Sequence, residues 1–394
     1  MKKNIIYILL IMVLSLFACL SCQNNEDARA DVEDDEPKVR AIVPDMILED
    51  EDIFVTRSAL VYQKPNMMFS WESSDQIGVF NIGIDAVPGG NVPFYFKRVD
   101  SYNENSTTAR FINGNFSFSD DTYWAACSPR ACVYTVSESN GGATISSKSL
   151  ASEYDVINLT YRGQTQVANA HPEGLKPVSG TVGYSYETEA KASSHLGAYD
   201  YLISQPTVPD ETGFTTFYFD HVGSTIRFYV LFPEGSFGGS GKKGYVTSMK
   251  VIDEDADFVT DVTLGIKKRL RSETVNTAEK SYEVIGEPTK VNNITMYLKA
   301  EDGGGVMVPD HGYFVTYMQV YPTSVAEGKC HLEFTVMVDG VKRYFRSQPL
   351  PAKTFEAGHV HMWQTQSFDT PIELTATLLP WEDIQGGSIS TGEE

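Results

Sequence analysis

The sequence predicts an all-β protein with two antiparallel β-sandwich domains in tandem. Short segments rich in aromatic and β-branched residues recur along the chain, and Gly, Asn, Asp and Ser separate them. No segment keeps the helical period of 3.6 residues over three turns. The 394 residues suit two domains of about 100 to 200 residues each once an N-terminal signal is removed.

The N-terminus is predicted to be a lipoprotein signal peptide over residues 1–21. Two lysines precede the apolar run Ile5 to Phe17, which is shorter than the roughly 20 residues a membrane-spanning helix needs. Cys22 is the preferred lipidation site because a small residue precedes it and polar, acidic residues follow, and Cys19 is the alternative. The other interpretation is a secreted protein without a lipid.

Residues 22–37 are predicted to be an acidic flexible tether, because they carry almost no apolar side chains to bury. The whole chain is acidic too, with a formal net charge of -21. Such a surface repels nucleic acid and anionic membranes, so the sequence predicts no polynucleotide partner.

The N-terminal domain is predicted over residues 38–210. Its first strand material lies at Val39–Met46, followed by Ile53–Val55. Residues 136–200 are rich in Ser, Gly, Thr and Tyr, which predicts long loops and edge strands. The other strand segments of this domain are bounded by turn residues and lie at Phe69–Trp71, Gln76–Phe80, Pro93–Phe96, Ala109–Phe111 and Thr122–Ala126.

A cluster of Pro and Gly residues between Pro206 and Gly213 predicts the domain boundary, so the C-terminal domain covers residues 211–394. The two clearest strands, Thr215–Phe219 and Ser224–Phe232, come next and are predicted to form a hairpin through a short link. Further strands are predicted at Val246–Ile252, Val259–Leu264, Ser281–Val284, Ile294–Leu298, Gly312–Tyr321, His331–Val338, Lys342–Phe345, His359–Trp363 and Ile372–Leu379.

Several of these segments resemble the fimbrillin-like proteins of Bacteroidales. Phe69–Trp71 and Asp75–Val79 together resemble the F-x-W…D-x-I-x-V signature of that family. Tyr218–Phe228 resembles the F-x-H…S-x-(I/L) segment that opens its second domain. Gly358–Trp363 and Ile372–Trp381 resemble its penultimate and last strands, so the resemblance covers nearly the whole chain after the signal.

The resemblance implies two transthyretin-like β-sandwiches in a structural, adhesive subunit of a pilus, exported to the outer membrane and cell surface as a lipoprotein. It also implies that a protease cutting after arginine removes the first strand and that a C-terminal strand of another subunit, identical or different, replaces it. Arg57 fits this cut because it follows the predicted first strand, and Arg40 is the earlier alternative. Arg57 is equally well interpreted as a surface residue between two strands.

The strand to be donated is predicted at Ile372, Leu374, Ala376 and Leu378, which alternate with polar residues as a half-buried strand requires. The residues after it carry few apolar anchors and include Gly386–Gly387. Either the strand detaches and is donated, or the subunit donates poorly and stands at an end of the fibre.

No arrangement of residues predicts an enzyme, a metal or a cofactor. His359 and His361 share one side of a predicted strand, but no third metal ligand is near in sequence. Asp253–Asp257 begins like a calcium loop, yet Phe258 stands where an EF-hand needs glycine, so an acidic turn is predicted. His221 is interpreted as a structural hydrogen-bonding residue rather than a base.

The remaining cysteines, Cys127, Cys132 and Cys330, match no zinc or redox motif. Cys127 and Cys132 either form a disulfide or act as buried thiols. The alternative function is a surface lipoprotein that does not polymerise and binds glycans through its aromatic residues, and a host or bacterial surface ligand fits either function. A third possible function is that of a secreted hydrolase, but the sequence shows no recognisable arrangement of the acid and nucleophile that such an enzyme needs.

Overall fold

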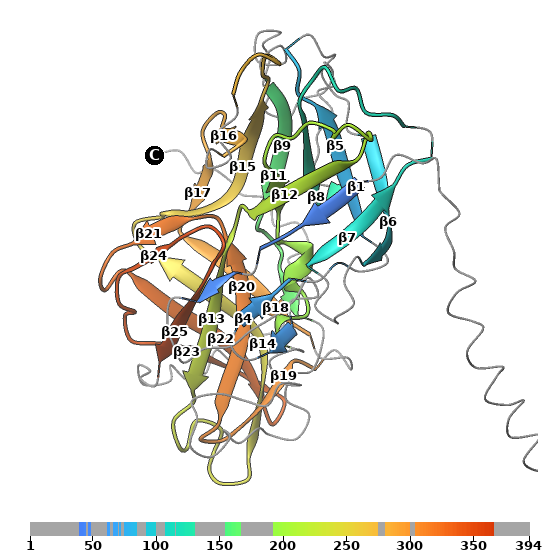
Figure 1. Ribbon diagram of the computed structural model, residues 1–394. Helices are drawn as coiled ribbons and strands as arrows, with labels where there is room; N and C mark the ends of the chain where they lie inside the picture. The colour runs from blue at the N-terminus through green and yellow to red at the C-terminus, as the bar shows by residue number, and fades with distance from the viewer. Residues whose placement is uncertain are drawn as a thin grey trace, which may run out of the picture.

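The computed structural model describes residues 39–44, 46–48, 61–63, 66–69, 71, 75–84, 92–99, 107–114, 116–130, 154–166, 192–274, 280–299 and 304–365. Strands dominate these residues and build two lobes stacked end to end (Figure 1). The prediction of an all-β protein is therefore confirmed. In this part of the chain, no helix has the length and apolar character needed to cross a membrane.

Seven strands close a barrel in the upper lobe, and its interior is filled by aromatic side chains. The ring of Trp71 meets that of Phe111 edge to face at 4.9 Å and that of Phe219 at 5.7 Å. In order around the barrel the strands are β1 (Val39–Ile42), β12 (Thr215–His221), β11 (Leu202–Ser204), β8 (Trp124–Ser128), β5 (Gln76–Asn81), β6 (Val92–Val99) and β7 (Thr108–Ile112).

A second sheet packs against the barrel on the side of β5, β8 and β11. Apolar residues of both sheets share one buried cluster that includes Phe80, Ile157 and Leu264. A buried lysine also joins them, since Lys268 Nζ lies 2.6 Å from Asp155 Oδ2 of the second sheet and donates to the Asn81 carbonyl of β5 at 2.9 Å. The strands of this sheet are β9 (Tyr154–Thr160), β15 (Phe258–Lys267), β16 (Tyr282–Val284) and β17 (Thr289–Val291).

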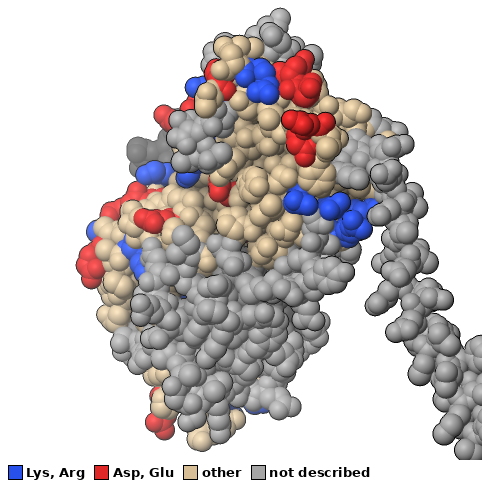
Figure 2. Space-filling view, viewed as in Figure 1, with Lys and Arg blue, Asp and Glu red and all other residues tan. Residues whose placement is uncertain are grey.

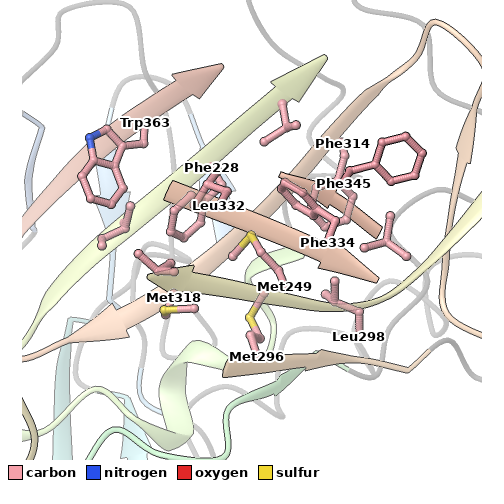
Figure 3. Close-up of a cluster of buried hydrophobic side chains, with 14 of the residues drawn as sticks. Phe228, Met249, Met296, Leu298, Phe314, Met318, Leu332, Phe334, Phe345 and Trp363 are labelled. Carbon is pink, nitrogen blue, oxygen red and sulfur yellow. The ribbon is translucent and has the colours of Figure 1, made fainter. Parts of the chain in front are cut away.

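The lower lobe is a sandwich of two sheets with one large apolar core between them. Figure 3 shows Phe228 and Trp363 of one sheet close to Met249 and Leu332 of the other. The first sheet has the order β2 (Ile47–Leu48), β25 (His359–Thr365), β13 (Ser224–Leu231) and β20 (Tyr313–Val320). The second has β10 (Thr165–Gln166), β18 (Asn293–Leu298), β14 (Lys243–Asp253), β22 (Cys330–Val338) and β23 (Val341–Arg346), with β19 (Val306–Pro309) also paired to β14.

Smaller elements complete the described part of the chain. Two ladders join β21 (Thr323–Val325) to β24 (Lys353–Phe355) and β3 (Val61–Gln63) to β4 (Asn66–Met68). A 3-10 helix, η3 (Leu196–Ala198), precedes β11.

The predicted hairpin of the two clearest strands is wrong. β12 pairs with β1 and β11 in the barrel, whereas β13 pairs with β20 and β25 in the lower lobe. Each strand already has a partner on both edges, so the link between them crosses from one lobe to the other. A Cβ atom on Gly223 in this link would lie 3.0 Å from Gln319 Oε1 and 3.1 Å from the Tyr161 hydroxyl, so the crossover requires a small residue.

The predicted first strand, Val39–Met46, is also divided by the structure. β1 ends at Ile42 and lies in the barrel, whereas β2 begins at Ile47 and lies at the edge of a sheet in the lower lobe. Pro44 stands between them, and proline cannot donate the N–H that a continuing ladder needs.

Strand pairing crosses the predicted domain boundary at several places. β12 belongs to the barrel, β9 pairs with β15, and β10 pairs with β18. The division into residues 38–210 and 211–394 stays a prediction, as does the transthyretin-like character of the two domains.

Candidate functional site: the N-terminal segment

The N-terminal strand β1 closes the barrel between two strands that are far from it in sequence. It runs antiparallel to β7, with Val39 opposite Phe111, and parallel to β12, with Val39 beside Thr215. Figure 1 shows β1 in blue between these two neighbours. Without β1, both β7 and β12 would expose an unpaired edge, which is where an added strand can bind.

The inward side chains of this segment are part of the barrel core. Val39 and Ala41 are fully buried, and Val43 is 1% exposed. They belong to the same cluster as Trp71 and Phe217. Burial of each valine stabilises the fold by about 1.5 to 3 kcal/mol, so β1 contributes to the core and is not only a covering strand.

Ala41 is the smallest buried residue of β1. Its neighbours in register are Ala109 on β7 and Phe217 on β12. Ala41 belongs to the same cluster as Trp71 and Phe111, whose rings pack edge to face, and because protein interiors are close-packed a longer side chain there would have to displace its neighbours. Side-chain size at this position is therefore restricted.

The outward face of β1 extends a row of arginines. Arg98, Arg110 and Arg40 lie opposite one another across β6, β7 and β1. The guanidinium carbons of Arg40 and Arg110 lie 5.1 and 5.7 Å from the centre of the Phe214 ring. Basic side chains gather over this part of the barrel in Figure 2, although the chain as a whole is acidic.

The segment continues from the barrel into the lower lobe. Ile47 and Leu48 of β2 pair in parallel with His359 and Val360 of β25. Just before them, Met46 is buried in a second apolar cluster on the outside of that sheet, and the Thr225 hydroxyl contacts its sulfur at 3.6 Å. Residues 39–48 therefore form strand pairs in both lobes and connect them.

A buried histidine holds the turn between β1 and β2. His221 Nδ1 lies 2.9 Å from Asp200 Oδ1, and His221 Nε2 lies 3.1 Å from the carbonyl oxygen of Pro44. Both partners are acceptors, so the ring donates from both nitrogens when it is protonated. We call His221, Asp200 and the Pro44 carbonyl the His221 latch.

Opposing effects act on the pKa of His221. Burial lowers this pKa, but the charge and hydrogen bond of Asp200, the Pro44 carbonyl and the charge of Asp220 raise it more, so the pKa is above 6.5. The structure thus agrees with the interpretation of His221 as a structural hydrogen-bonding residue.

A cavity of about 280 Å³ lies beside the latch. The second oxygen of Asp200, Oδ2, is buried and has no protein hydrogen-bond partner. Water in the cavity would satisfy this oxygen. The other lining residues are Phe69, Asp75, Ser128, Pro129, Gly197, Ala198 and Leu202.

Most residues predicted to be processed or donated lie outside the described residues and stay predictions. They are Cys19, Cys22, Arg57, Ile372, Leu374, Ala376 and Leu378, and the same applies to Cys132 as a partner of Cys127. Arg40 is described and lies within β1, with backbone partners on both edges. Cys127 is fully buried at the interface of the barrel and the second sheet, and Cys330 is fully buried in the lower core.

The histidines considered as metal ligands make local hydrogen bonds. His361 Nε2 accepts the N–H of Glu356 at 3.1 Å, and His359 Nδ1 lies 2.9 Å from the Ala357 carbonyl oxygen. Across the described ranges, no group of three or more His, Cys, Asp or Glu side chains is arranged to hold a metal ion.

Asp253 shapes the predicted acidic turn. Its carboxylate accepts the backbone N–H of Asp255 at 3.3 Å and that of Asp257 at 2.7 Å. The carboxylate oxygens therefore satisfy the turn backbone, as expected for an Asx-type turn.

Sequence reasoning missed the arginine row and Asp200 as the partner of His221. The signal for Asp200 is weak, because a single aspartate between two tyrosines has no recognisable spacing to a histidine 21 residues later. The arginine row follows from the register of β6, β7 and β1, which the sequence does not contain.

No protein-family model matches the sequence, and no curated protein matches it. Several solved structures are similar. A "putative cell adhesion protein" from Bacteroides ovatus is 13% identical with a TM-score of 0.40, covering 86% of this chain and 96% of that one. A fimbrial protein from Bacteroides ovatus is 11% identical with a TM-score of 0.28, covering 84% and 49%. A fimbrial assembly protein from Parabacteroides distasonis is 10% identical with a TM-score of 0.31, covering 84% and 92%. Because these TM-scores are below 0.5, the proposals below rest on the strand pairing of this chain.

Proposed function

We propose that this chain is a structural and adhesive subunit of a fimbria, exported to the bacterial surface as a lipoprotein and assembled by strand exchange. The observation that carries the proposal is the position of β1. It lies inside a closed barrel, yet it is the first strand of the described chain, so no connection between two other described strands passes through it. Its removal would open the barrel and leave the links between the remaining strands intact.

The cut that releases this strand is proposed to follow Arg57. This residue lies between β2, which ends at Leu48, and β3, which begins at Val61. A cut there separates both β1 and β2 from the rest of the chain. A cut after Arg40 would fall inside β1, where the backbone is paired on both sides, and would leave Ala41 to Leu48 attached.

The opened groove between β7 and β12 is proposed to accept an extended strand from another subunit. Backbone N–H and C=O groups on both edges supply hydrogen bonds, and the inward pockets select alternate side chains. The lipid on Cys22 would then be a temporary anchor, because it leaves with the removed segment. The proposed role is structural and involves no catalysis.

Replacement of Arg57 by alanine tests this function. Assembly should be lost because the N-terminal segment stays in the barrel, so the surface protein keeps its lipidated cysteine and does not form polymers resistant to SDS. Mass spectrometry of the mature N-terminus should give Ser58 for the wild type. Arg40→Ala is the matched control and should be processed like the wild type. Polymers of Arg57→Ala protein with an intact N-terminus would contradict the proposal.

A second candidate function is glycan binding without polymerisation, and one observation favours it. On the outer face of the lower lobe, Tyr297, Ser248, Thr335 and Tyr344 form a row across four paired strands. The two tyrosines are 48% and 45% exposed, and three strand spacings place them about 14 Å apart. Loss of binding to a glycan array after Tyr297→Ala or Tyr344→Ala, in a protein that stays monomeric, would support this function.

A further inference from the structure

A second stretch of the chain repeats the side-chain pattern of the first residues of the N-terminal segment. Residues 39–46 are Val-Arg-Ala-Ile-Val-Pro-Asp-Met, and residues 374–381 are Leu-Thr-Ala-Thr-Leu-Leu-Pro-Trp. Aligned without a gap, both have a large apolar residue, an alanine, a large apolar residue and again a large apolar residue at positions one, three, five and eight.

In residues 39–46 of the N-terminal segment, the side chains at these four positions are buried. Val39, Ala41 and Val43 fill the barrel, and Met46 fills the cluster outside the lower-lobe sheet. The residues between them, Arg40 and Ile42, are only partly buried. The four apolar residues of the second stretch therefore match the four buried positions of the first, including the last one, which strict strand alternation does not explain.

We propose that residues 374–381 of one copy replace residues 39–46 of the next copy in this register, with Ala376 at the place of Ala41, and run in the same direction. This inference rests on the proposed assembly by strand exchange. It adds the register, the direction and the residues that determine them.

The Ala41 position determines the register. Phe217 and Ala109 flank it in the barrel, and its methyl group is fully buried. A slip of two residues would place Leu374 or Leu378 there, and the longer side chain would have to displace aromatic rings. A slip of one residue would turn the threonines inward and the apolar residues toward solvent.

The last position determines the direction. With the same direction as β1, Trp381 takes the place of Met46 in its apolar cluster, and Pro380 falls between the positions of β1 and β2. In the opposite direction, Ala376 would still meet the Ala41 position, but Pro371 would take the place of Met46. Proline fills an apolar pocket less well than tryptophan, so the first direction is favoured.

The proposed strand is also compatible with the His221 latch and with the outward face of the barrel at the position of Arg40. The carbonyl of Leu379 would stand where the Pro44 carbonyl now accepts the hydrogen bond of His221 at 3.1 Å. Thr375 would stand at the place of Arg40 and remove one positive charge from the row that contains Arg110. Threonine is also well suited to a paired strand.

A disulfide experiment on the full chain tests the register. Ala109 is the antiparallel neighbour of Ala41, at a separation that permits a disulfide between the two strands. A protein with Ala376→Cys and Ala109→Cys should form covalent ladders on non-reducing gels after processing and assembly. The matched proteins that combine Ala109→Cys with Leu374→Cys or with Leu378→Cys should not, and each single variant controls for the native cysteines.

The outcomes separate the register from the proposed function. Ladders from the Leu374 or Leu378 pair would overturn the register while leaving strand exchange in place. Absence of polymers from the parent protein under processing conditions would reject strand exchange itself.

A second pair of variants avoids any change in the barrel core. Ala376→Trp should reduce polymer yield roughly tenfold or more because the Ala41 pocket cannot hold it, and Thr375→Trp should polymerise normally because it faces outward. Equal yields would overturn the register. Trp381→Ala should weaken the polymers toward SDS, and unchanged polymers would overturn the direction.

Discussion

His221 is the residue at which the N-terminal segment meets the rest of the molecule. Its ring nitrogens lie 2.9 Å from Asp200 and 3.1 Å from the Pro44 carbonyl oxygen, and its side chain is almost fully buried. A buried charge pair of this kind stabilises a fold only while both partners are present, because a lone buried carboxylate is costly. The latch therefore adds a buried hydrogen bond to the strand pairing that holds the N-terminal segment.

Replacement of His221 by phenylalanine should lower the free energy of unfolding by about 3 to 5 kcal/mol, because Asp200 and the Pro44 carbonyl lose their donors. Urea denaturation measures this change. His359→Phe is the control, since His359 is partly exposed and contacts the Ala357 carbonyl in its own turn, and it should change stability by less than about 1 kcal/mol. Equal losses in the two variants would exclude the latch.

The contribution of the latch should depend on pH. The pKa of His221 in the folded protein is above the unfolded value of 6.5, so the full contribution is present below pH 6.5 and is lost as pH rises through the folded pKa. The difference in unfolding free energy between the wild type and His221→Phe should therefore be larger at pH 6 than at pH 9. A gap that widens with pH would show that the ring is neutral when folded.

His195 acts in the opposite direction and must be separated from this effect. Its burial lowers the pKa from 6.5 to about 4, so it destabilises the fold as pH falls below 6.5. Because His195 is present in both proteins, its contribution cancels in the difference.

At the scale of elements, two properties of β1 matter: its pairing and its connection to the rest of the chain. It is central in the barrel, with partners on both edges, and it is connected to the described chain only through its C-terminal end. The first property makes it a source of stability, and the second makes it separable by a single cut.

A longer side chain at Ala41 should weaken the packing of β1 in the barrel. Ala41→Leu should destabilise the protein by about 1 to 3 kcal/mol, since its methyl group is fully buried and protein cores are close-packed. Ile42→Leu, on the partly exposed face of the same strand, should change stability by about 0.5 kcal/mol or less. Thermal unfolding followed by circular dichroism compares the two, and a tolerant Ala41 would contradict the packing argument.

At the scale of the whole molecule, the layers are joined by few but well-buried contacts. The barrel and the sheet of β9 and β15 share an apolar cluster, and Lys268, which pairs with Asp155 of β9, donates a hydrogen bond to the Asn81 carbonyl of the barrel. The barrel and the lower lobe are joined by residues 39–48 and by the crossover at Gly223. Loss of the N-terminal segment would leave the first junction intact and weaken the second.

Removal of the buried lysine should therefore affect the entire fold. Lys268→Ala should cost about 3 to 5 kcal/mol because Asp155 loses its buried ammonium partner. Lys290→Ala is the matched control, since its pair with Asp257 at 3.0 Å is largely exposed, and it should cost less than about 1 kcal/mol. Guanidinium denaturation compares the two variants, and a small effect of Lys268→Ala would contradict a structural role for the pair.

The sequence alone determined where most of the longer strands lie and which side of β1 is apolar, but it did not locate β9, which lies where long loops and edge strands were predicted. In β1, Val39, Ala41 and Val43 alternate with residues that are only partly buried, and this alternation is a local property that the sequence shows directly. The same reasoning identified β12 and β13 and the acidic turn at Asp253.

Only the tertiary structure decided which strand pairs with which. Every residue except proline carries the same backbone hydrogen-bonding groups, so nothing local prevents Thr215–His221 from pairing with Ser224–Leu231. In the folded protein each of these two strands instead pairs with two other strands. β1 lies between β7 and β12 rather than at the edge of a sheet. The pairing of distant strands, and not the composition of any one, placed the N-terminal strand between β7 and β12 in the barrel.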